Sequence, residues 1–346
     1  MPIIAAEKLE DTIRRLLAAC GTPGDEAETV ARHVVDANLC GHDSHGAIQI
    51  PIYIDRVEKG HIVPGAPFEI VRESPTTTVI DGHWGFGYAI AERALKLTME
   101  KAEAQNVAAC TIFRQSHVGR LGAYPTMAAK AGFIAMMTAD SGRSAKSVAP
   151  FGGAEARLGT NPIAMAVPSA RGEPVLIDMA TSAVAAGKIK LAQARGKPIP
   201  EGWIVRSDGG ASTDPNDFGN GAVLLPLGGS EGHKGYGLSA MVEILSGLLT
   251  GLGFGVEPTG RHNDGCFLAL FKAAAFRDPD EFGREVDEFV DYLKGTRAAA
   301  GVEEVLAPGE IERRNAQARR ESGIDIEDAT WSQFRALGEK YGVPVG

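Results

Sequence analysis

The sequence has few cysteines, no strongly basic segment and no long apolar run. Its four cysteines are scattered along the chain: Cys20, Cys40, Cys110 and Cys266. None forms a Cys-x-x-Cys pair, which argues against a disulfide framework or a zinc site and fits reduced thiols. The formal net charge is −9 without a dense Lys/Arg stripe, so we expect no nucleic-acid partner and no anionic membrane partner.

Long apolar segments and targeting signals are also missing. The most apolar stretches, such as 132–138, are far shorter than the roughly 20 residues that span a bilayer. The first residues, MPIIAAEKLEDTIRR, lack the basic start and apolar centre of a signal peptide. We therefore expect a cytoplasmic protein.

The composition is that of an ordinary soluble globular protein, with 346 residues, 44% hydrophobic and 23% charged. Hydrophobic residues recur at helical spacing in 6–40, and short β-branched runs alternate with further helical segments from 76 onward. This alternation predicts a three-layer α/β fold. We expect a helical domain formed by 1–70 with 277–346, and a mixed-sheet, cofactor-binding domain over 71–276. A polar surface excursion is expected at 206–222.

The glycine fingerprint of the usual dinucleotide-binding fold is absent. The nearest match, 82–87, has the order G-x-x-G-x-G instead of G-x-G-x-x-G, and no acidic residue ends a following strand at the expected distance. We interpret this segment as a turn between a strand and a helix.

Two histidines lie in glycine-bearing turns. His45 occurs in Ser44-His45-Gly46, and His117 occurs in Ser116-His117-Val118-Gly119. Imidazole titrates near neutral pH, so these two residues are candidates for proton transfer. The spacing of His42, Asp43 and His45 also allows a metal-dependent hydrolase or lyase, although no third ligand of matching spacing follows.

A carboxylate and a glycine-rich segment complete the candidate site. Asp178 ends an apolar run and is predicted to open into a crevice, where it can orient a histidine. The alternative is that Asp178 caps the helix predicted over 183–194, but Thr181 or Ser182 can also serve as that cap. The segment 228–237 opens the next long helix (234–250) and, with Lys234, is either an anion site or a flexible loop.

Several short motifs occur in order along nearly the whole chain: 43–46 with Pro51 and Tyr53, Ser116-His117-x-Gly119, Pro150-x-Gly152-Gly153, 158–162, 178–182, 233–237 and Pro308-Gly309-Glu310. In these motifs the chain resembles the type-2 malate/L-lactate dehydrogenase family, which includes sulfolactate, ureidoglycolate and diketogulonate oxidoreductases and a cyclic-imine reductase. The resemblance implies a nicotinamide-dependent oxidoreductase with a non-Rossmann, mixed-sheet fold. It also implies a homodimer with the active site between subunits.

The resemblance assigns roles to individual residues. His45 or His117 would move the proton, with Ser44 and Asp178 supporting the site, and we favour His117 as the base. The residues expected to bind the cofactor are Ser141, Gly159, Thr160, Asn161, Asp178, Met179, Ala180 and Lys234. We expect NAD(H) and do not exclude NADP(H), for whose 2′-phosphate Arg143 and Lys146 are candidate ligands.

One position departs from the family pattern. Many members have an arginine five residues after the serine of the Ser-His-Gly motif, where it would bind the substrate carboxylate, but this chain has Gln49. An amide cannot form a bidentate ion pair. Our hypothesis is that Arg120 binds the carboxylate instead. The expected substrate is a small anionic 2-hydroxy or 2-oxo acid; a cyclic imine carboxylate and a non-catalytic binding role are the alternatives.

Overall fold

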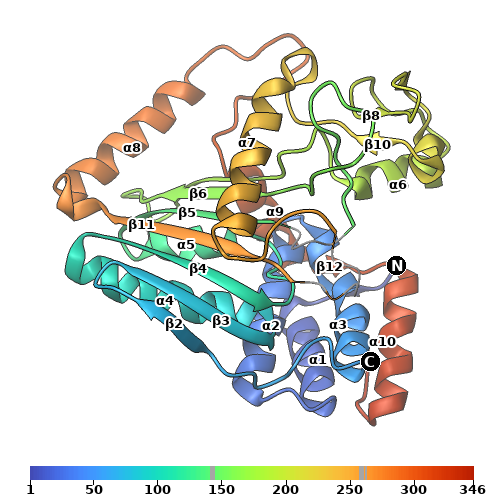
Figure 1. Ribbon diagram of the computed structural model, residues 1–346, viewed down its shortest axis with the longest axis horizontal. Coiled ribbons are helices and arrows are strands. Elements are labelled where there is room, and N and C mark those ends of the chain that lie inside the picture. The colour runs from blue at the N-terminus through green and yellow to red at the C-terminus, as the bar shows by residue number, and fades with distance from the viewer. Residues whose placement is uncertain (141–144, 257–260, 262) are drawn as a thin grey trace.

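The computed structural model describes residues 1–140, 145–256, 261 and 263–346. At its centre is a seven-stranded sheet of order β2-β3-β4-β11-β5-β6-β7 (Figure 1). Its strands are β2 (Glu69–Glu73), β3 (Thr77–Gly85), β4 (Val107–Gln115), β5 (Phe133–Ala139), β6 (Ile163–Val167), β7 (Val175–Met179) and β11 (Cys266–Lys272). Only β3 and β4 pair in parallel in this sheet. The predicted mixed, non-Rossmann sheet is confirmed.

Helices lie on both faces of the sheet. On one face, α4 (Gly87–Gln105) and α5 (Ala123–Lys130) bury Leu95 and Tyr124 against strand residues such as Ile112. On the other face, α7 (His233–Glu243) continues into a π-helical segment, Ile244–Leu248, that packs over β5 and β11. The sequence predicts one regular helix to 250. The structure ends the α-helical geometry at Glu243, and π-helical turns of this kind are frequent near functional sites.

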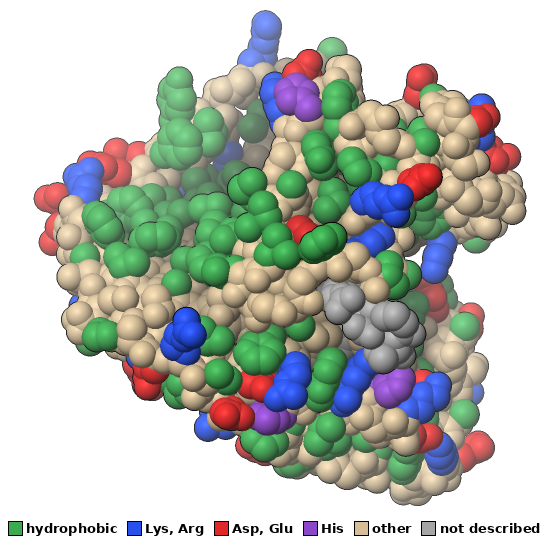
Figure 2. Space-filling model, viewed as in Figure 1, with side chains coloured by type: hydrophobic (Ala, Val, Ile, Leu, Met, Phe, Trp, Pro, Cys, Tyr) green, Lys and Arg blue, Asp and Glu red, His purple; other side chains and the backbone are tan. Residues whose placement is uncertain are grey.

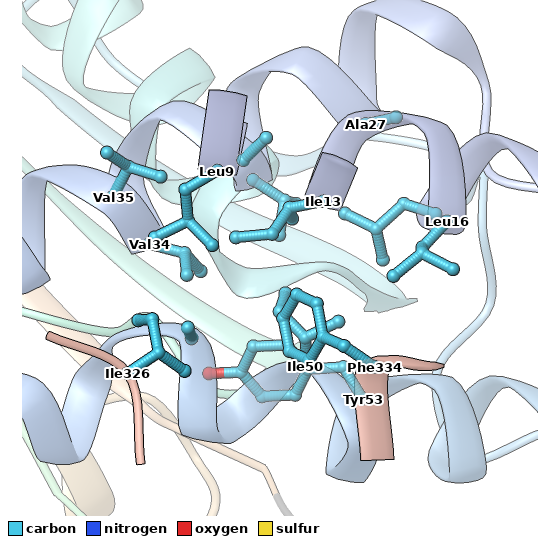
Figure 3. Close-up of a cluster of buried hydrophobic side chains, with 14 of the residues drawn as sticks. Leu9, Ile13, Leu16, Ala27, Val34, Val35, Ile50, Tyr53, Ile326 and Phe334 are labelled. Atoms are coloured by element: carbon cyan, nitrogen blue, oxygen red, sulfur yellow. The ribbon is translucent and has the colours of Figure 1, made fainter. Parts of the chain in front are cut away.

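A separate core joins the two ends of the chain. It is formed by α1 (Ala6–Ala19), α2 (Gly24–Leu39), α3 (Ile50–Glu58) and α10 (Asp328–Tyr341), with the short strands β1 (Ile3–Ile4) and β12 (Ile324–Asp325) paired beside them. Leu9, Ile13 and Leu16 recur on one face of α1 and meet Phe334 of α10 in this core (Figure 3). Each such side chain stabilises the fold by about 1.5–3 kcal/mol.

This core supports a helical unit made of both chain ends, but not in every part. α9 (Glu310–Ser322) contributes Ala316, whereas α8 (Pro279–Lys294) contributes no residue to the core. We therefore keep the division into 1–70 with 277–346 and 71–276 as a proposal, with α8 as the element that fits it least.

The segments 148–158 and 184–224 together form a small unit with its own hydrophobic core. It contains α6 (Ala186–Ala194), a three-stranded sheet of β8 (Ile204–Val205), β9 (Ala211–Ser212) and β10 (Val223–Leu224), and a 3₁₀ helix, Pro215–Asn220. The predicted excursion at 206–222 therefore carries a strand of this sheet. The predicted helix cap is wrong: α6 begins at Ala186, Thr181 bonds to the carbonyls of Thr160 and Asn161, and Ser182 bonds to that of Val184.

Large apolar side chains are exposed along α7, α8 and the nearby sheet face. Phe289 and Tyr292 of α8 are 58% and 76% exposed, Leu249 after α7 is 57% exposed, and Met165 and Ile177 are exposed on β6 and β7. Figure 2 shows hydrophobic side chains gathered over this part of the surface. Large exposed apolar patches are common at the interaction sites of proteins. No helix in the described part of the chain has the length and apolarity to cross a membrane.

Candidate active site

The structure brings His45 and His117 together. His45 ends a 3₁₀ turn (Asp43–His45) between α2 and α3, and His117 follows β4. The two rings are stacked, with centroids 5.4 Å apart and 26° between their planes. Two imidazoles from segments that are distant in the sequence therefore lie side by side. Both could contact one small substrate.

The His45 turn is shaped by Asn38. The Asn38 side-chain oxygen accepts a hydrogen bond from the Ala47 amide at 2.7 Å. A Cβ atom on Gly46 would lie 2.2 Å from that oxygen, so only glycine fits after His45. Ser44, which is exposed, has its hydroxyl 2.9 Å from His45 Nδ1, and Gln49 donates its side-chain amide to the Ser44 carbonyl at 2.7 Å.

The electrostatic surroundings keep His45 neutral. Burial lowers the pKa of His45 below its usual value, and nearby His42 and Arg120 lower it further. Asp178 and Asp264 oppose this decrease without cancelling it. A neutral imidazole at neutral pH can accept a proton from a substrate hydroxyl.

The His117 loop is positioned by the segment that resembled a dinucleotide motif. Gly85 pairs with Gln115 across the parallel strands β3 and β4, so both strands end at the same edge. A Cβ on Gly87 would lie 2.2 Å from the Ser116 carbonyl oxygen and 2.5 Å from that of His117. Gly87 therefore allows the close packing of α4 against the loop that carries His117.

Arg120 binds two carboxylates and lies close enough to His45 to lower its pKa. Its Nη2 is 2.8 Å from Asp36 on α2, and its Nη1 is 3.5 Å from Asp178 at the end of β7. Asp178 also accepts a hydrogen bond from the Gly122 amide at 2.9 Å. The Arg120 side chain is only 5% exposed, so an incoming carboxylate would have to replace one of these partners.

Most residues predicted to bind a cofactor lie next to one another. Met179 pairs with Ile163 across β6 and β7, and the Thr181 amide donates to the Thr160 carbonyl at 2.9 Å. Asn161, which has a positive φ of 38°, donates its side-chain amide to Glu243 of α7 at 2.9 Å. The Asn161 side-chain oxygen is buried with no hydrogen-bond partner in the described structure. This polar atom fits a site for a group bearing its own donors.

The lysines predicted to bind an anion or the 2′-phosphate of NADP differ in how exposed they are. Lys234, on the first turn of α7, is 71% exposed and lies 3.3 Å from Glu231. Lys146 is 3% exposed and binds Glu243 at 3.1 Å, so it is not available for a 2′-phosphate unless that pair breaks. Ser141 and Arg143 lie outside the described residues.

Two cavities are lined by further motif residues. One of about 430 Å³ lies between β7, α8 and α9, where Val175, Pro308 and Glu310 contribute to its wall. A second of about 240 Å³ is lined by Gly152, Gly153 and the glycines at 229 and 232. The glycine motifs therefore meet in space although they are far apart in the sequence.

The residues of the metal hypothesis do not gather as ligands. His42 lies 3.5 Å from Glu312, and Asp43 binds Arg319 at 2.7 Å. Among the described residues, the one group with ligand spacing lies elsewhere and consists of Glu69, Asp81 and His83. Asp81 in that group already accepts hydrogen bonds from Nε and Nη2 of Arg114.

Comparisons with known proteins show relatives that match nearly the whole chain. The malate dehydrogenase of Pyrococcus abyssi is 35% identical over 98% of this chain and 95% of its own length. The L-sulfolactate dehydrogenase of Methanothermobacter thermautotrophicus is 37% identical over 94% and 93%. The crystal structure of malate dehydrogenase from Entamoeba histolytica superposes with a TM-score of 0.94, at 31% identity over 99% of both chains.

The matches over the full chain define the class of protein first: it is a dehydrogenase. The sequence model of the malate/L-lactate dehydrogenase family matches residues 4–335. The chain belongs to that family.

Proposed function

We propose that the protein catalyses reversible, NAD(P)-dependent oxidation of a 2-hydroxy acid to the 2-oxo acid. The observation that carries this proposal is the stacked pair of His45 and His117, with Asp178 nearby at the end of β7. Family membership supports it, because the family is described by malate and L-lactate dehydrogenation.

In the oxidative direction a neutral histidine takes the hydroxyl proton, and in reduction the imidazolium returns it. Positioned acid–base groups of this kind are worth about 10²–10⁴ in rate. Ser44 supports His45 through its Nδ1 contact. Asp178 is held by Arg120 and the Gly122 amide. Its negative charge lies near the site and stabilises the cationic form of His45.

The proposed cofactor site consists of Gly159, Thr160, Asn161, Asp178, Met179, Ala180 and Lys234, with Ser141 as a further candidate. The buried, unpartnered oxygen of Asn161 and the exposed ammonium of Lys234 support it. A bound nicotinamide would supply or accept the hydride, and the protein orients it against the substrate. We favour NAD(H), since Lys146 is occupied by Glu243, and do not exclude NADP(H).

Substrate binding is proposed for Arg120 and Gln49. Arg120 provides charge but is shared with two carboxylates, whereas Gln49 lies on the His45 turn and provides an amide. Changing Gln49→Arg adds a guanidinium where the family pattern has one. If Gln49 faces the substrate carboxylate, this change lowers KM for 2-oxo acids; an unchanged KM, with KM raised by Arg120→Met, assigns the role to Arg120.

We also propose a homodimer with the active site at the interface. The exposed apolar residues of α7, α8 and the sheet support it, since a second copy is the partner that would cover them. Light scattering of the purified protein tests the dimer. Phe289→Glu with Tyr292→Glu should produce monomers, and loss of activity in those monomers would support a shared site.

A panel of 2-oxo acids, a cyclic imine carboxylate and both reduced cofactors tests the reaction, followed as loss of nicotinamide absorbance. If only the cyclic imine is reduced, the substrate is a cyclic imine carboxylate and not a 2-oxo acid. If no compound reacts, fluorescence titration with NADH and NADPH separates a binding protein from an enzyme. Activity that is lost on chelation and restored by a metal ion would favour the hydrolase or lyase alternative.

A further inference from the structure

A chain of hydroxyl groups ends on His117. Tyr53, on α3, has its hydroxyl oxygen 2.6 Å from His117 Nδ1. The same oxygen lies 3.0 Å from the hydroxyl oxygen of Tyr88, in the first turn of α4. Tyr88 and Tyr53 are 0% and 1% exposed, so this chain runs from the candidate active site into the core.

Tyr88 is locked in place by the glycine of the Ser-His-x-Gly motif. Gly119 has a φ of +73°, and a Cβ at this position would lie 2.1 Å from a ring carbon of Tyr88 and 2.4 Å from its hydroxyl oxygen. The Tyr88 ring therefore occupies the space that any other residue at 119 would fill. The motif that carries His117 is built around this tyrosine.

The direction of the hydrogen bonds between Tyr88, Tyr53 and His117 can be assigned from their hydroxyl protons. Burial raises the pKa of both phenols, so each keeps one proton across the working range. In the described structure, the hydroxyl of Tyr88 makes one hydrogen bond, to Tyr53. A buried hydroxyl without an acceptor is costly. Tyr88 therefore donates to Tyr53, and Tyr53 donates to His117 Nδ1.

We propose that Tyr53 and Tyr88 are positioning residues that fix His117 as the neutral imidazole protonated at Nε2. A proton on Nδ1 would reverse both hydrogen bonds and leave the Tyr88 hydroxyl without an acceptor. His117 therefore donates a hydrogen bond from Nε2 to the substrate oxygen and keeps its proton. This role in turnover rests on the proposed function.

Proton transfer then falls to His45, in contrast to the preference for His117 drawn from the sequence. Its partner Ser44 is exposed, so the Ser44 hydroxyl can donate to water while it accepts from His45 Nδ1. His45 Nε2 is then open to protonation without stranding a buried group. In oxidation the hydroxyl proton of the substrate moves to His45 and His117 retains its own proton, while a bound nicotinamide would accept the hydride.

Long-range ¹H–¹⁵N NMR of the full-length protein, labelled at histidine, reads the tautomer directly. The His117 signals are identified by their loss in His117→Gln. We expect Nε2 protonated and Nδ1 unprotonated, with a tautomer ratio of about tenfold or more, given the cost of an unsatisfied buried hydroxyl. His117 protonated at Nδ1 in the unchanged protein would overturn the proposal.

Three variants sharpen this test. Tyr53→Phe removes the donor to Nδ1, so the tautomer ratio should fall toward that of a free imidazole. Tyr88→Phe removes the donor that occupies the Tyr53 oxygen, so the preference for Nε2–H should weaken, but less than in Tyr53→Phe, because the Tyr53 hydroxyl still has His117 Nδ1 as an acceptor. An unchanged tautomer ratio in Tyr88→Phe would overturn the role of Tyr88. Tyr124→Phe is the matched control, since Tyr124 is equally buried and its hydroxyl binds the Val118 carbonyl on the same loop, not the imidazole.

The spectra are recorded without substrate or cofactor. A correct tautomer in a protein that reduces no 2-oxo acid contradicts the proposed function alone. Turnover by a protein whose His117 carries its proton on Nδ1 contradicts this inference alone. Tyr53→Phe should also lower kcat by about tenfold with little change in KM, because only part of the donor population remains.

Discussion

The two stacked histidines lie in different surroundings. His117 belongs to a loop held by buried tyrosines, with the Val118 amide bound to Asp264 at 3.0 Å. His45 belongs to a short turn whose serine is open to solvent. Under our proposal, this difference gives one residue type two roles. A partner that cannot reach water would fix a tautomer, whereas a partner that can reach water would allow the ring to gain and lose a proton.

The largest effect is expected from replacing the proton carrier. His45→Gln should lower kcat by about 10²–10⁴, the usual worth of acid–base catalysis. His117→Gln preserves an amide donor and should cost less than the about 10²–10³ expected for losing a donor outright. Steady-state kinetics in both directions measure this contrast. Equal losses in the two variants would remove the distinction between the histidines.

Arg120 links the two sides, because it follows His117 on its loop and binds Asp36 on the helix that leads to His45. Arg120→Met leaves the buried Asp178 carboxylate without its cation, so we expect a loss of about 3 kcal/mol in the free energy of unfolding. Urea denaturation measures it. The control is Arg14→Met, whose pair with Asp11 is about half exposed and should change stability by less than about 0.5 kcal/mol. Similar values for both variants would show that the buried pair is not essential.

The pH dependence should follow His45. Its pKa is lowered by burial, with His42 and Arg120 adding to the decrease and Asp178 and Asp264 opposing it. Oxidation needs the neutral ring, so its rate should fall only below pH about 6.5, the ordinary histidine pKa. Reduction needs the cation, so its rate should rise as the pH decreases through the same range. Profiles of kcat against pH test this, and a midpoint above pH 7 that disappears in His45→Gln would contradict it.

The stability of the protein should also depend on pH through His45, and it should decrease as the pH falls. A folded-state pKa below the unfolded value means that the unfolded chain binds more protons at low pH. The His45 contribution is therefore neutral above pH about 6.5 and becomes destabilising as the pH falls below it. The melting temperature of the wild type should decrease faster than that of His45→Gln in this range; parallel curves would exclude the effect.

The smallest effect is expected at Ser44. Its hydroxyl is exposed and replaceable by water, so Ser44→Ala should lower kcat by less than about tenfold. The matched variant is Tyr53→Phe, which removes a buried hydroxyl from the other histidine. A loss at Ser44 larger than that at Tyr53 would reverse the comparison.

Local features of this fold could be predicted from the sequence. The spacing of Leu9, Ile13 and Leu16 defines the buried face of α1, and the β-branched run at 107–113 defines most of β4. A glycine one residue after His45 and two residues after His117 also indicated unusual turns. These features depend on neighbours within a few residues, which periodicity and turn chemistry report.

Long-range contacts could not be predicted. The insertion of β11 between β4 and β5 and the pairing of Arg120 with Asp36 join segments that no local pattern relates. Tyr88 was also missed, since a tyrosine in an early helical turn is an ordinary core residue. Its signal lay in the glycine at 119, whose missing side chain becomes meaningful only when the ring that fills the space is seen.

The close contact between Tyr88 and Gly119 also indicates which positions should be avoided in protein engineering. Diversification at 87, 88 or 119 would disturb the backbone on which the chemistry depends, so libraries there should yield mostly inactive clones. Gln49 lies on the His45 turn and is half-exposed. Substitutions there can be screened for new substrate specificities with little loss of stability.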